Sequence, residues 1–258
     1  MEKITFKNTK RALRNRNANK TAVPTAQPQK KQLCVYCTFL LKQTASYFVT
    51  HGSSVHAVFL DASKAFDRVL HMKLFEKLIQ RNVPMCFVRL LKHWYKEQTM
   101  QIKWGKHFFE PFHVSNGVRQ GRVLNPYLFA VYLDDLSNEL SNIKAGCYIG
   151  EVLLNHLMFA DDIWVFCPSV RWLQRIPDVC QAYAESHGII FSCNKTVCMT
   201  FKAKRAKSTA TPVLKLGGQY VKSDDQYKCL GIALDIELPD GKDIQRQLRY
   251  QYCVANKL

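Results

Sequence analysis

The stretch MFADDIWVF, Met158–Phe166, sets two adjacent carboxylates, Asp161 and Asp162, between two runs of apolar and aromatic residues. Adjacent like charges repel, and a carboxylate is costly to bury without a compensating partner. The flanking runs have the character of strands, and Ala160 is small enough for a tight turn between them. We therefore predict a hairpin whose tip carries both acids toward a sheet, although such a pair is also typical of an exposed turn. A cation at this tip would meet only oxygen ligands, which favours Mg²⁺ or Mn²⁺ over zinc.

Two other pairs of adjacent aspartates occur, and their surroundings differ. Asp134 and Asp135 lie in LFAVYLDDLSNEL, whose apolar spacing is helical, so we predict that this pair lies on a solvated helix face. Asp224 and Asp225 lie in KSDDQ, which predicts a polar turn. Only the first pair has strand-like apolar runs on both sides.

A third acid follows another buried strand. The stretch VHAVFLDASKAFD, Val55–Asp67, places Asp61 at the end of an apolar run. If that strand lies beside the hairpin, Asp61 joins Asp161 and Asp162 around a pair of divalent ions. Two such ions activate an attacking 3′-hydroxyl and stabilise a leaving pyrophosphate. The three acids together therefore predict nucleotidyl transfer.

Hydrophobic periodicity gives the order of the remaining elements. It predicts helices over 33–49, 71–97 (two helices, the second beginning at Pro84), 126–142 and 169–187, strands over 55–60, 152–160, 163–167, 189–201 and 227–234, and hairpins turning at Gly105–Lys106 and Gly217–Gly218. This order indicates an α+β domain with a mostly antiparallel sheet and helices packed on one face.

The charge balance favours a polyanionic partner. The net charge is +17 and 12% of the residues are aromatic, which indicates nucleic acid first and an anionic membrane surface second, against the alternative of a merely basic protein. Residues 1–32 are predicted to form a basic, disordered arm. No apolar run approaches the length of a membrane span, so no membrane association is expected. Without a secretory signal, the ten cysteines are interpreted as reduced thiols of an intracellular protein.

Five motifs then resemble a known family in their order and spacing. They are FLDASKAFDRV, NGVRQGRVLNPYLF, MFADDIWVF, NKTVCMTF and YKCLGI. Together they resemble the reverse transcriptase of non-LTR (LINE-type) retrotransposons, and the form DASKAFD is typical of that class rather than of intron maturases or telomerases. The resemblance covers roughly residues 33–258.

The resemblance implies a polymerase palm with a ferredoxin-like antiparallel sheet. It implies that Asp61 and Asp161 are the shared ligands of Mg²⁺ (or Mn²⁺), with Asp162 the third acid. The backbone at Ala62 would cradle the incoming triphosphate. Phe66 resembles the steric gate that excludes a 2′-hydroxyl, and its alternative is an ordinary core residue.

The remaining motifs imply further contacts with substrate. Arg119, Gln120 and Gly121 resemble the loop under the nascent base pair, although Arg119 is equally typical of a surface arginine. Lys195 is similar to the lysine proposed to assist the departure of pyrophosphate. Residues 230–231 (Leu230 and Gly231) resemble the primer-grip turn. The expected partners are an RNA template, a DNA primer and deoxynucleoside triphosphates, and family logic places the protein in the nucleus.

Several positions depart from the family pattern. Arg122 replaces a small residue, Asn125 replaces a serine and Phe159 replaces a tyrosine. We interpret residues 33–245 as the palm with a remnant of the fingers, and 246–258 as the start of a truncated thumb helix. A chain lacking full fingers and thumb is expected to have weak or no processive activity. The alternative function is a non-catalytic nucleic-acid-binding remnant, which the basic charge alone would support.

Overall fold

The fold is seen in a computed structural model that describes residues 30–118, 124–203, 212–229 and 232–237. Its contacts divide the chain into two units, Met1–Val35 and Tyr36–Leu258, and all the described strands belong to the larger unit. The helices are α2 (Lys30–Thr50, which begins in the smaller unit), α3 (His71–Gln80), α4 (Met85–Lys96), α5 (Asn125–Asn142) and α6 (Val170–Ser186), with a 3₁₀ turn, η1, at Ala65–Arg68. No helix of the described residues is long and apolar enough to cross a membrane.

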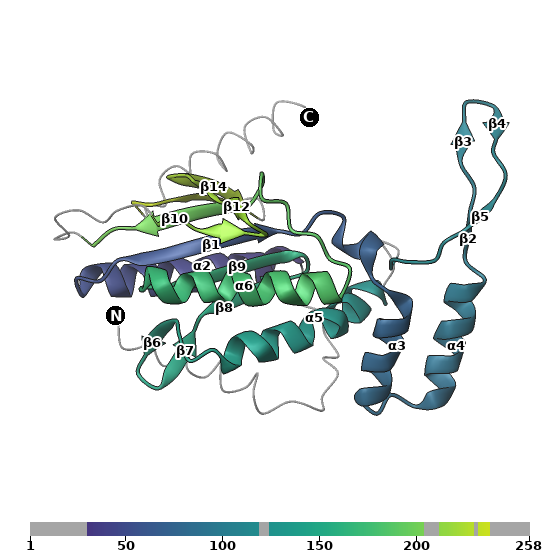
Figure 1. Cartoon of the computed structure of the whole chain (residues 1–258), viewed down its shortest axis with the longest axis horizontal. Coiled ribbons are helices and arrows are strands. Elements are labelled where there is room, and N and C mark those ends of the chain that lie inside the picture. The colour runs from purple at the N-terminus through teal and green to yellow at the C-terminus, as the bar shows by residue number, and fades with distance from the viewer. Residues whose placement is uncertain (1–29, 119–123, 204–211, 230–231, 238–258) are drawn as a thin grey trace, which may run out of the picture. The chain divides into compact units, whose positions relative to one another are not determined.

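A five-stranded sheet forms the centre of the larger unit (Figure 1). Its order is β13 (Lys222–Ser223), β10 (Val197–Phe201), β1 (Val55–Asp61), β9 (Asp162–Cys167) and β8 (His156–Phe159). Only the pairing of β10 with β13 is parallel, so the predicted mostly antiparallel sheet is confirmed. β1 lies in the middle, and its near-continuous apolar sequence suits a strand that is buried on both faces.

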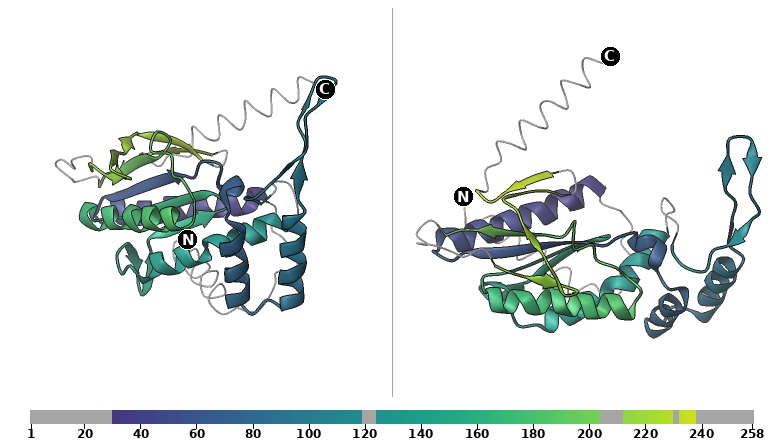
Figure 2. Two further views of the ribbon diagram at one scale, coloured as in Figure 1. Left: turned by 45° about the vertical axis from the view of Figure 1, so that its right-hand side comes forward. Right: turned by 45° about the horizontal axis from the view of Figure 1, so that its top comes forward.

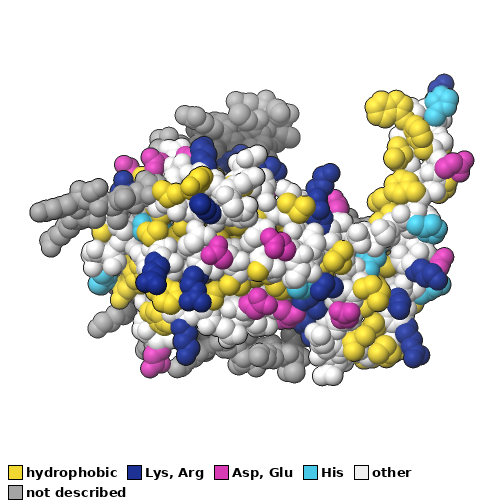
Figure 3. All heavy atoms as spheres, viewed as in Figure 1, with side chains coloured by type: hydrophobic (Ala, Val, Ile, Leu, Met, Phe, Trp, Pro, Cys, Tyr) yellow, Lys and Arg dark blue, Asp and Glu magenta, His cyan; other side chains and the backbone are white. Residues whose placement is uncertain are grey.

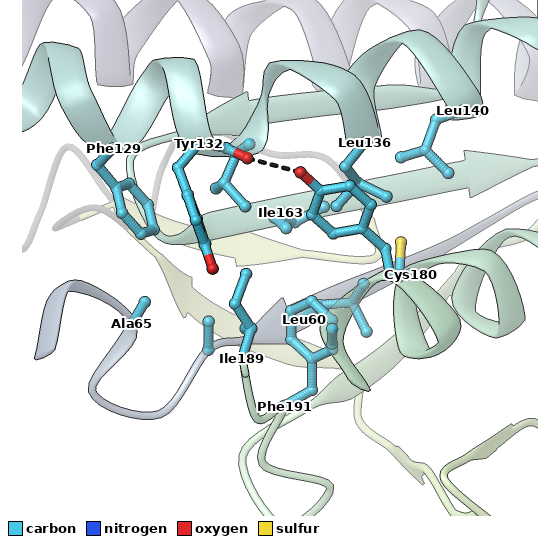
Figure 4. Close-up of a cluster of buried hydrophobic side chains, with 14 of the residues drawn as sticks. Leu60, Ala65, Phe129, Tyr132, Leu136, Leu140, Ile163, Cys180, Ile189 and Phe191 are labelled. Carbon is cyan, nitrogen blue, oxygen red and sulfur yellow. Dashed lines mark hydrogen bonds between the residues drawn. The ribbon is translucent and has the colours of Figure 1, made fainter. Parts of the chain in front are cut away.

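Helices α5 and α6 cover one face of this sheet. Leu60 of β1 and Ile163 of β9 point toward Phe129 and Leu136 of α5 and Cys180 of α6, forming the main core (Figure 4). A hydrogen bond from the Tyr183 hydroxyl to the Tyr132 carbonyl (2.6 Å) links the two helices across this core. The predicted helical face is therefore present.

The opposite face of the sheet is also covered, which corrects the prediction of helices on one face alone. Figure 2 shows α2 on the side of the sheet away from α6, and its Leu41 is fully buried. On the same face the ring of Phe59 contacts Trp164 (5.6 Å between centroids) and stacks on Tyr227 (4.5 Å). Phe59 and Trp164 are cross-strand neighbours, so this second core follows from the β1–β9 register.

Short hairpins make up the other strands. They are β2 (Thr99–Met100) with β5 (Phe112–His113), β3 (Lys103–Trp104) with β4 (His107–Phe108), β6 (Cys147–Ile149) with β7 (Val152–Leu154), β11 (Lys215–Leu216) with β12 (Gln219–Tyr220), and β14 (Gln226–Cys229) with β15 (Ile232–Asp235). The turns predicted at Gly105 and Gly217 are present, and both glycines have positive φ.

The arm formed by β2–β5 carries no core of its own. Every residue from 101 to 110 is exposed, and the Trp104 residue is 78% accessible to solvent. Hydrophobic side chains gather along this arm in Figure 3. An isolated two-stranded hairpin is only marginally stable in water, so the arm has little stability of its own.

Three predicted strands are wrong in extent. Residues 152–160 form two strands, because the Asn155 side chain donates to the carbonyls of Leu140 and Ile143 and so interrupts the run. Residues 189–201 form a strand only from Val197 onward, since the chain turns at the preceding residues. Residues 227–234 contribute to two antiparallel strands, β14 and β15, rather than to one.

Candidate active site

The β1–β9 register brings two of the predicted acids together. Asp61 at the end of β1 is the direct cross-strand partner of Asp162 at the start of β9. Direct partners in an antiparallel pair project from the same face of a sheet. Side chains alternate along a strand, so both acids share the face of Phe59 and Trp164, away from α5 and α6. The sequence placed each acid at a strand end, and the structure makes them neighbours.

Asp161 lies at the tip of the hairpin that the sequence predicted. Phe159 of β8 pairs with Asp162 of β9, which leaves Ala160 and Asp161 as the two-residue turn. Ala160 has a φ of +52°, a backbone conformation that costs an L-residue about 1–2 kcal/mol. Strain of this kind persists where the surrounding structure holds it, and it is common at functional sites. The turn therefore places the backbone of Asp161 directly before Asp162, the cross-strand partner of Asp61.

The backbone around Asp61 is fixed by a segment that follows α6. Ser192 donates its N–H to the Asp61 carbonyl (2.9 Å), and Ser63 donates to the Ile190 carbonyl (2.8 Å). Between them Ala62 forms an isolated bridge with Phe191. The predicted triphosphate-cradling residue Ala62 is thus buried in a backbone ladder, with its position set on both sides.

Lys195 lies close to Asp61. Its Nζ lies 3.7 Å from Oδ2 of Asp61, and its side chain is 69% exposed. Lys195 lies in a tight turn, in which the N–H groups of Lys195 and Thr196 both donate to the Ser192 carbonyl. An exposed pair at this distance adds little stability, so its importance lies in placing an ammonium beside the acid.

Thr196 is a site residue that the sequence analysis did not single out. Its hydroxyl accepts a hydrogen bond from the Asp61 backbone N–H at 3.4 Å, and Thr196 is fully buried. The signal was present in the sequence, because Thr196 directly follows Lys195 in the same NKT motif.

The donor set fits a hard divalent cation in its chemistry. All three acids offer only carboxylate oxygens, which Mg²⁺ and Mn²⁺ prefer. Within the described part of the chain, no group of three or more His, Cys, Asp or Glu side chains is close enough together to hold a metal ion. The carboxylates of Asp61, Asp161 and Asp162 therefore do not converge on one point in this structure.

Phe66 lies in the 3₁₀ turn that follows Asp61. Its ring stacks on Phe129 of α5 (4.3 Å between centroids, 30° between planes) and is partly buried against the main core. The ring lies at the edge of the core and keeps some exposure. Its position is therefore compatible both with an ordinary core residue and with a steric gate.

Several predicted residues lie outside the described residues. These are Arg119, Gln120, Gly121 and Arg122 of the motif RQGR, Leu230 and Gly231, residues 1–29 of the basic arm predicted over 1–32, and residues 246–258. The last three residues of that arm, 30–32, are helical and begin α2, which corrects the prediction of disorder there. Asn125, the other departure in that loop, is buried and accepts a hydrogen bond from the Tyr95 hydroxyl (3.3 Å).

Asp134 lies on the solvated helix face predicted for it, with a side chain that is 56% exposed, whereas the side chain of Asp135 faces α3 and is 39% exposed. Asp135 pairs with Lys77 of α3, whose side chain is only 7% exposed, and Arg81 contacts both acids (2.8 and 3.2 Å). Burial opposes ionisation of Asp135, but the hydrogen bond and charge of Lys77, with those of Arg81, hold the pKa of this carboxyl below its usual value. The Asp135–Lys77 pair joins α3 to α5. Asp224 and Asp225 lie in the short connection between β13 and β14, where Asp224 is half-buried and Asp225 is exposed.

Comparison with known proteins agrees with this geometry. The family model described as reverse transcriptase (RNA-dependent DNA polymerase) matches residues 2–234. The chain is 28% identical over 190 residues to the Pol polyprotein of the type-2 retrotransposable element R2DM of Drosophila melanogaster, covering 70% of this chain and 18% of that protein. It is 30% identical over 186 residues to the RNA-directed DNA polymerase from mobile element jockey of Drosophila funebris, covering 70% and 19%.

Solved structures share the fold at much lower identity. Apo telomerase from Candida tropicalis superposes with a TM-score of 0.56 at 12% identity, covering 82% of this chain and 39% of that one. Compared with its curated sequence relatives, from R2DM and jockey, the chain spans about a fifth of their length. The family match extends over most of the described residues and includes all three acids. This chain therefore belongs to the reverse transcriptase family, and its sequence relatives are the polymerases of non-LTR retrotransposable elements.

Proposed function

We propose that this chain is the palm of an RNA-directed DNA polymerase, which extends a DNA primer on an RNA template by two-metal nucleotidyl transfer. The observation that carries the proposal is the β1–β9 register, which pairs Asp61 with Asp162 and leaves Asp161 at the adjoining turn. Like charges directly opposite each other destabilise an antiparallel pair of strands, so the pairing of Asp61 with Asp162 indicates a role beyond folding.

The family resemblance suggests the proposed roles, and the short distance between Lys195 and Asp61 supports them. A bound pair of Mg²⁺ or Mn²⁺ ions supplies Lewis acidity toward the primer 3′-hydroxyl and the pyrophosphate. Asp61 and Asp161 hold this pair, and Asp162 adds negative charge from the same strand end. Lys195, with its ammonium 3.7 Å from Asp61, donates a proton to the leaving pyrophosphate.

Selection of the nucleotide depends on the segment after Asp61. The backbone at Ala62 receives the triphosphate of a deoxynucleotide. The ring of Phe66, which Phe129 supports from below, lies under the sugar and leaves no room for a 2′-hydroxyl. By the family resemblance, we assign residues 119–121 to the nascent base pair and residues 230–231 to the primer.

The test uses the purified chain, a primed RNA template, deoxynucleotides and Mg²⁺ or Mn²⁺. We expect Asp161→Asn to lower extension by at least about a hundredfold, equivalent to about 2.7 kcal/mol of transition-state stabilisation. The matched control is Asp178→Asn, which removes an exposed acid of α6 that accepts from Gln174 and leaves the site intact. Equal extension by the Asp161→Asn variant and the wild type would overturn the proposal.

A metal titration supplies a second readout that does not depend on extension. Mn²⁺ binding followed by electron paramagnetic resonance should weaken in Asp61→Asn and in Asp161→Asn but not in Asp178→Asn. A chain that binds Mn²⁺ no better than the two site variants, and that extends no primer, has no metal-dependent function.

The second candidate is a nucleic-acid-binding module without catalysis, which the net charge of +17 favours. It predicts an affinity for RNA that falls steeply with salt and that is unchanged by removal of the three acids. Strong salt-dependent binding together with absent Mn²⁺ binding would support this candidate over the polymerase.

A further inference from the structure

The segment Asn116–Val118 lies directly against the loop that carries Phe66. Val118 donates its N–H to the Phe66 carbonyl (2.7 Å), and Gly117 donates its N–H to the Val69 carbonyl (2.8 Å). Asn116 forms an isolated bridge with Leu70. We refer to residues 116–118 as the clasp. It joins the loop after Asp61 to the chain that leads into the motif RQG.

Only glycine fits at position 117, because the backbone of Asp67 lies so close to it. The φ of Gly117, +92°, is a conformation that L side chains rarely adopt. A Cβ added at Gly117 would stand 2.8 Å from the Asp67 carbonyl oxygen and 2.9 Å from its Cα. Both atoms belong to the backbone, so they cannot rotate away as the end of a side chain would. Any other residue must therefore push the clasp and the Phe66 loop apart.

A side chain reinforces the same contact. Nε2 of His71, the first residue of α3, lies 2.8 Å from the Gly117 carbonyl and donates its hydrogen to it. The ring of His71 is held in turn by Tyr95 of α4, with 4.5 Å between centroids. Because His71 and Gly117 are 46 positions apart in the chain, the bond fixes a tertiary contact rather than a local turn.

Phe66 is consequently held on two sides. Its ring rests on Phe129 (4.3 Å), and its carbonyl is bound by Val118. Because Val69 and Leu70 are tied to the clasp as well, the loop cannot tilt without breaking several of these bonds.

We propose that Gly117 and His71 are positioning residues for sugar discrimination, because the clasp sets the height of the Phe66 ring under the incoming nucleotide. This inference rests on the proposed function. In this inference Gly117 and His71 do not touch the nucleotide. They act on the choice between deoxynucleotide and ribonucleotide through Phe66, which does. Moving the loop away from the clasp shifts the Phe66 ring from its place on Phe129 and opens space for a 2′-hydroxyl.

The test compares incorporation of deoxynucleotides and ribonucleotides by the full chain. Gly117→Ala should lower the preference for deoxynucleotides by about tenfold, since a displacement of about 1 Å at a positioning group costs up to about a hundredfold. Gly105→Ala is the matched control, because Gly105 also has positive φ (+61°) but has no atom within 4 Å of an added Cβ. It should leave the preference unchanged.

A milder pair of variants covers the case in which Gly117→Ala does not fold. His71→Ala removes the bond to the Gly117 carbonyl and should lower the preference several-fold, whereas His71→Gln, whose amide can donate to the same carbonyl, should restore it. A residue needed only for folding would change the total extension without changing the ratio.

The outcomes separate this inference from the proposed function. If Phe66→Ala lowers the preference but the Gly117 and His71 variants keep the wild-type ratio, the clasp has no part in discrimination and the inference fails alone. If the wild-type chain extends no primer and binds no Mn²⁺, the proposed function fails and the inference fails with it.

Discussion

Replacing Asp135 by alanine should destabilise this fold far more than replacing its neighbour Asp134. Lys77 is buried beneath α5, with Nζ 5.4 Å from the Tyr183 ring centroid and 6.0 Å from that of Tyr132, and Asp135 is its ion-pair partner. Breaking a fully buried pair costs about 3–5 kcal/mol, because the remaining charge has no partner. The Asp135 side chain is 39% exposed, so water screens part of the attraction between its carboxylate and Lys77. We therefore expect a loss of about 2 kcal/mol for Asp135→Ala.

The matched variant Asp134→Ala removes a carboxylate that is 56% exposed and contacts Arg81. Its cost should be below about 0.5 kcal/mol, in the range of ordinary surface pairs. Lys77→Met should cost less than about 1.5 kcal/mol, because methionine suits the space between the two tyrosine rings. In the double variant Lys77→Met/Asp135→Ala no charge is left buried, so much of the loss should be recovered.

Urea denaturation at pH 7, followed by circular dichroism, gives these differences provided that the dependence on urea concentration keeps the same slope. Equal losses for Asp135→Ala and Asp134→Ala would refute the claim that Lys77 needs its partner. A double variant as unstable as Asp135→Ala would show that the loss comes from something other than an uncompensated lysine.

Two further predictions concern single positions. Ala160→Gly should raise the free energy of unfolding by up to about 1 kcal/mol, because it relieves a φ of +52° at a smaller entropic cost; a lower stability in the same urea assay would contradict the strain. Burial lowers the pKa of His156 to about 4 from an unfolded value near 6.5, so the stability it contributes is present above pH 6.5 and is lost as the pH falls toward 4, by up to about 3 kcal/mol. His156→Gln should flatten this part of the pH–stability curve, and an unchanged curve would mean that folding does not lower the pKa of His156.

The sequence was sufficient where local chemistry decides the structure. The apolar runs of β1 and β9, the start of α4 at Pro84 and the end of α6 before Gly188 all follow from residue type and spacing. It failed where a distant partner decides. Asn155 divides a predicted strand because it bonds to the end of α5, and Asp135 is drawn to Lys77 of another helix.

The candidate site shows the same division. Each acid could be placed at a strand end from the sequence, yet their adjacency depends on the register between β1 and β9, which a one-residue slip would reverse. Gly117 was visible as part of a motif, but its role follows only from the 2.8 Å approach to the backbone of Asp67.

The central position of β1 also affects how the chain can fold during synthesis. His56 of β1 pairs with Thr200 of β10, 144 residues later in the chain. A nascent chain that has not reached β10 therefore holds an apolar strand with an unpaired edge, a state that slows folding and invites association with other chains. Asp61 is translated before β9, β10 and the turn at Lys195, so its surroundings are completed only when these segments have emerged and joined β1.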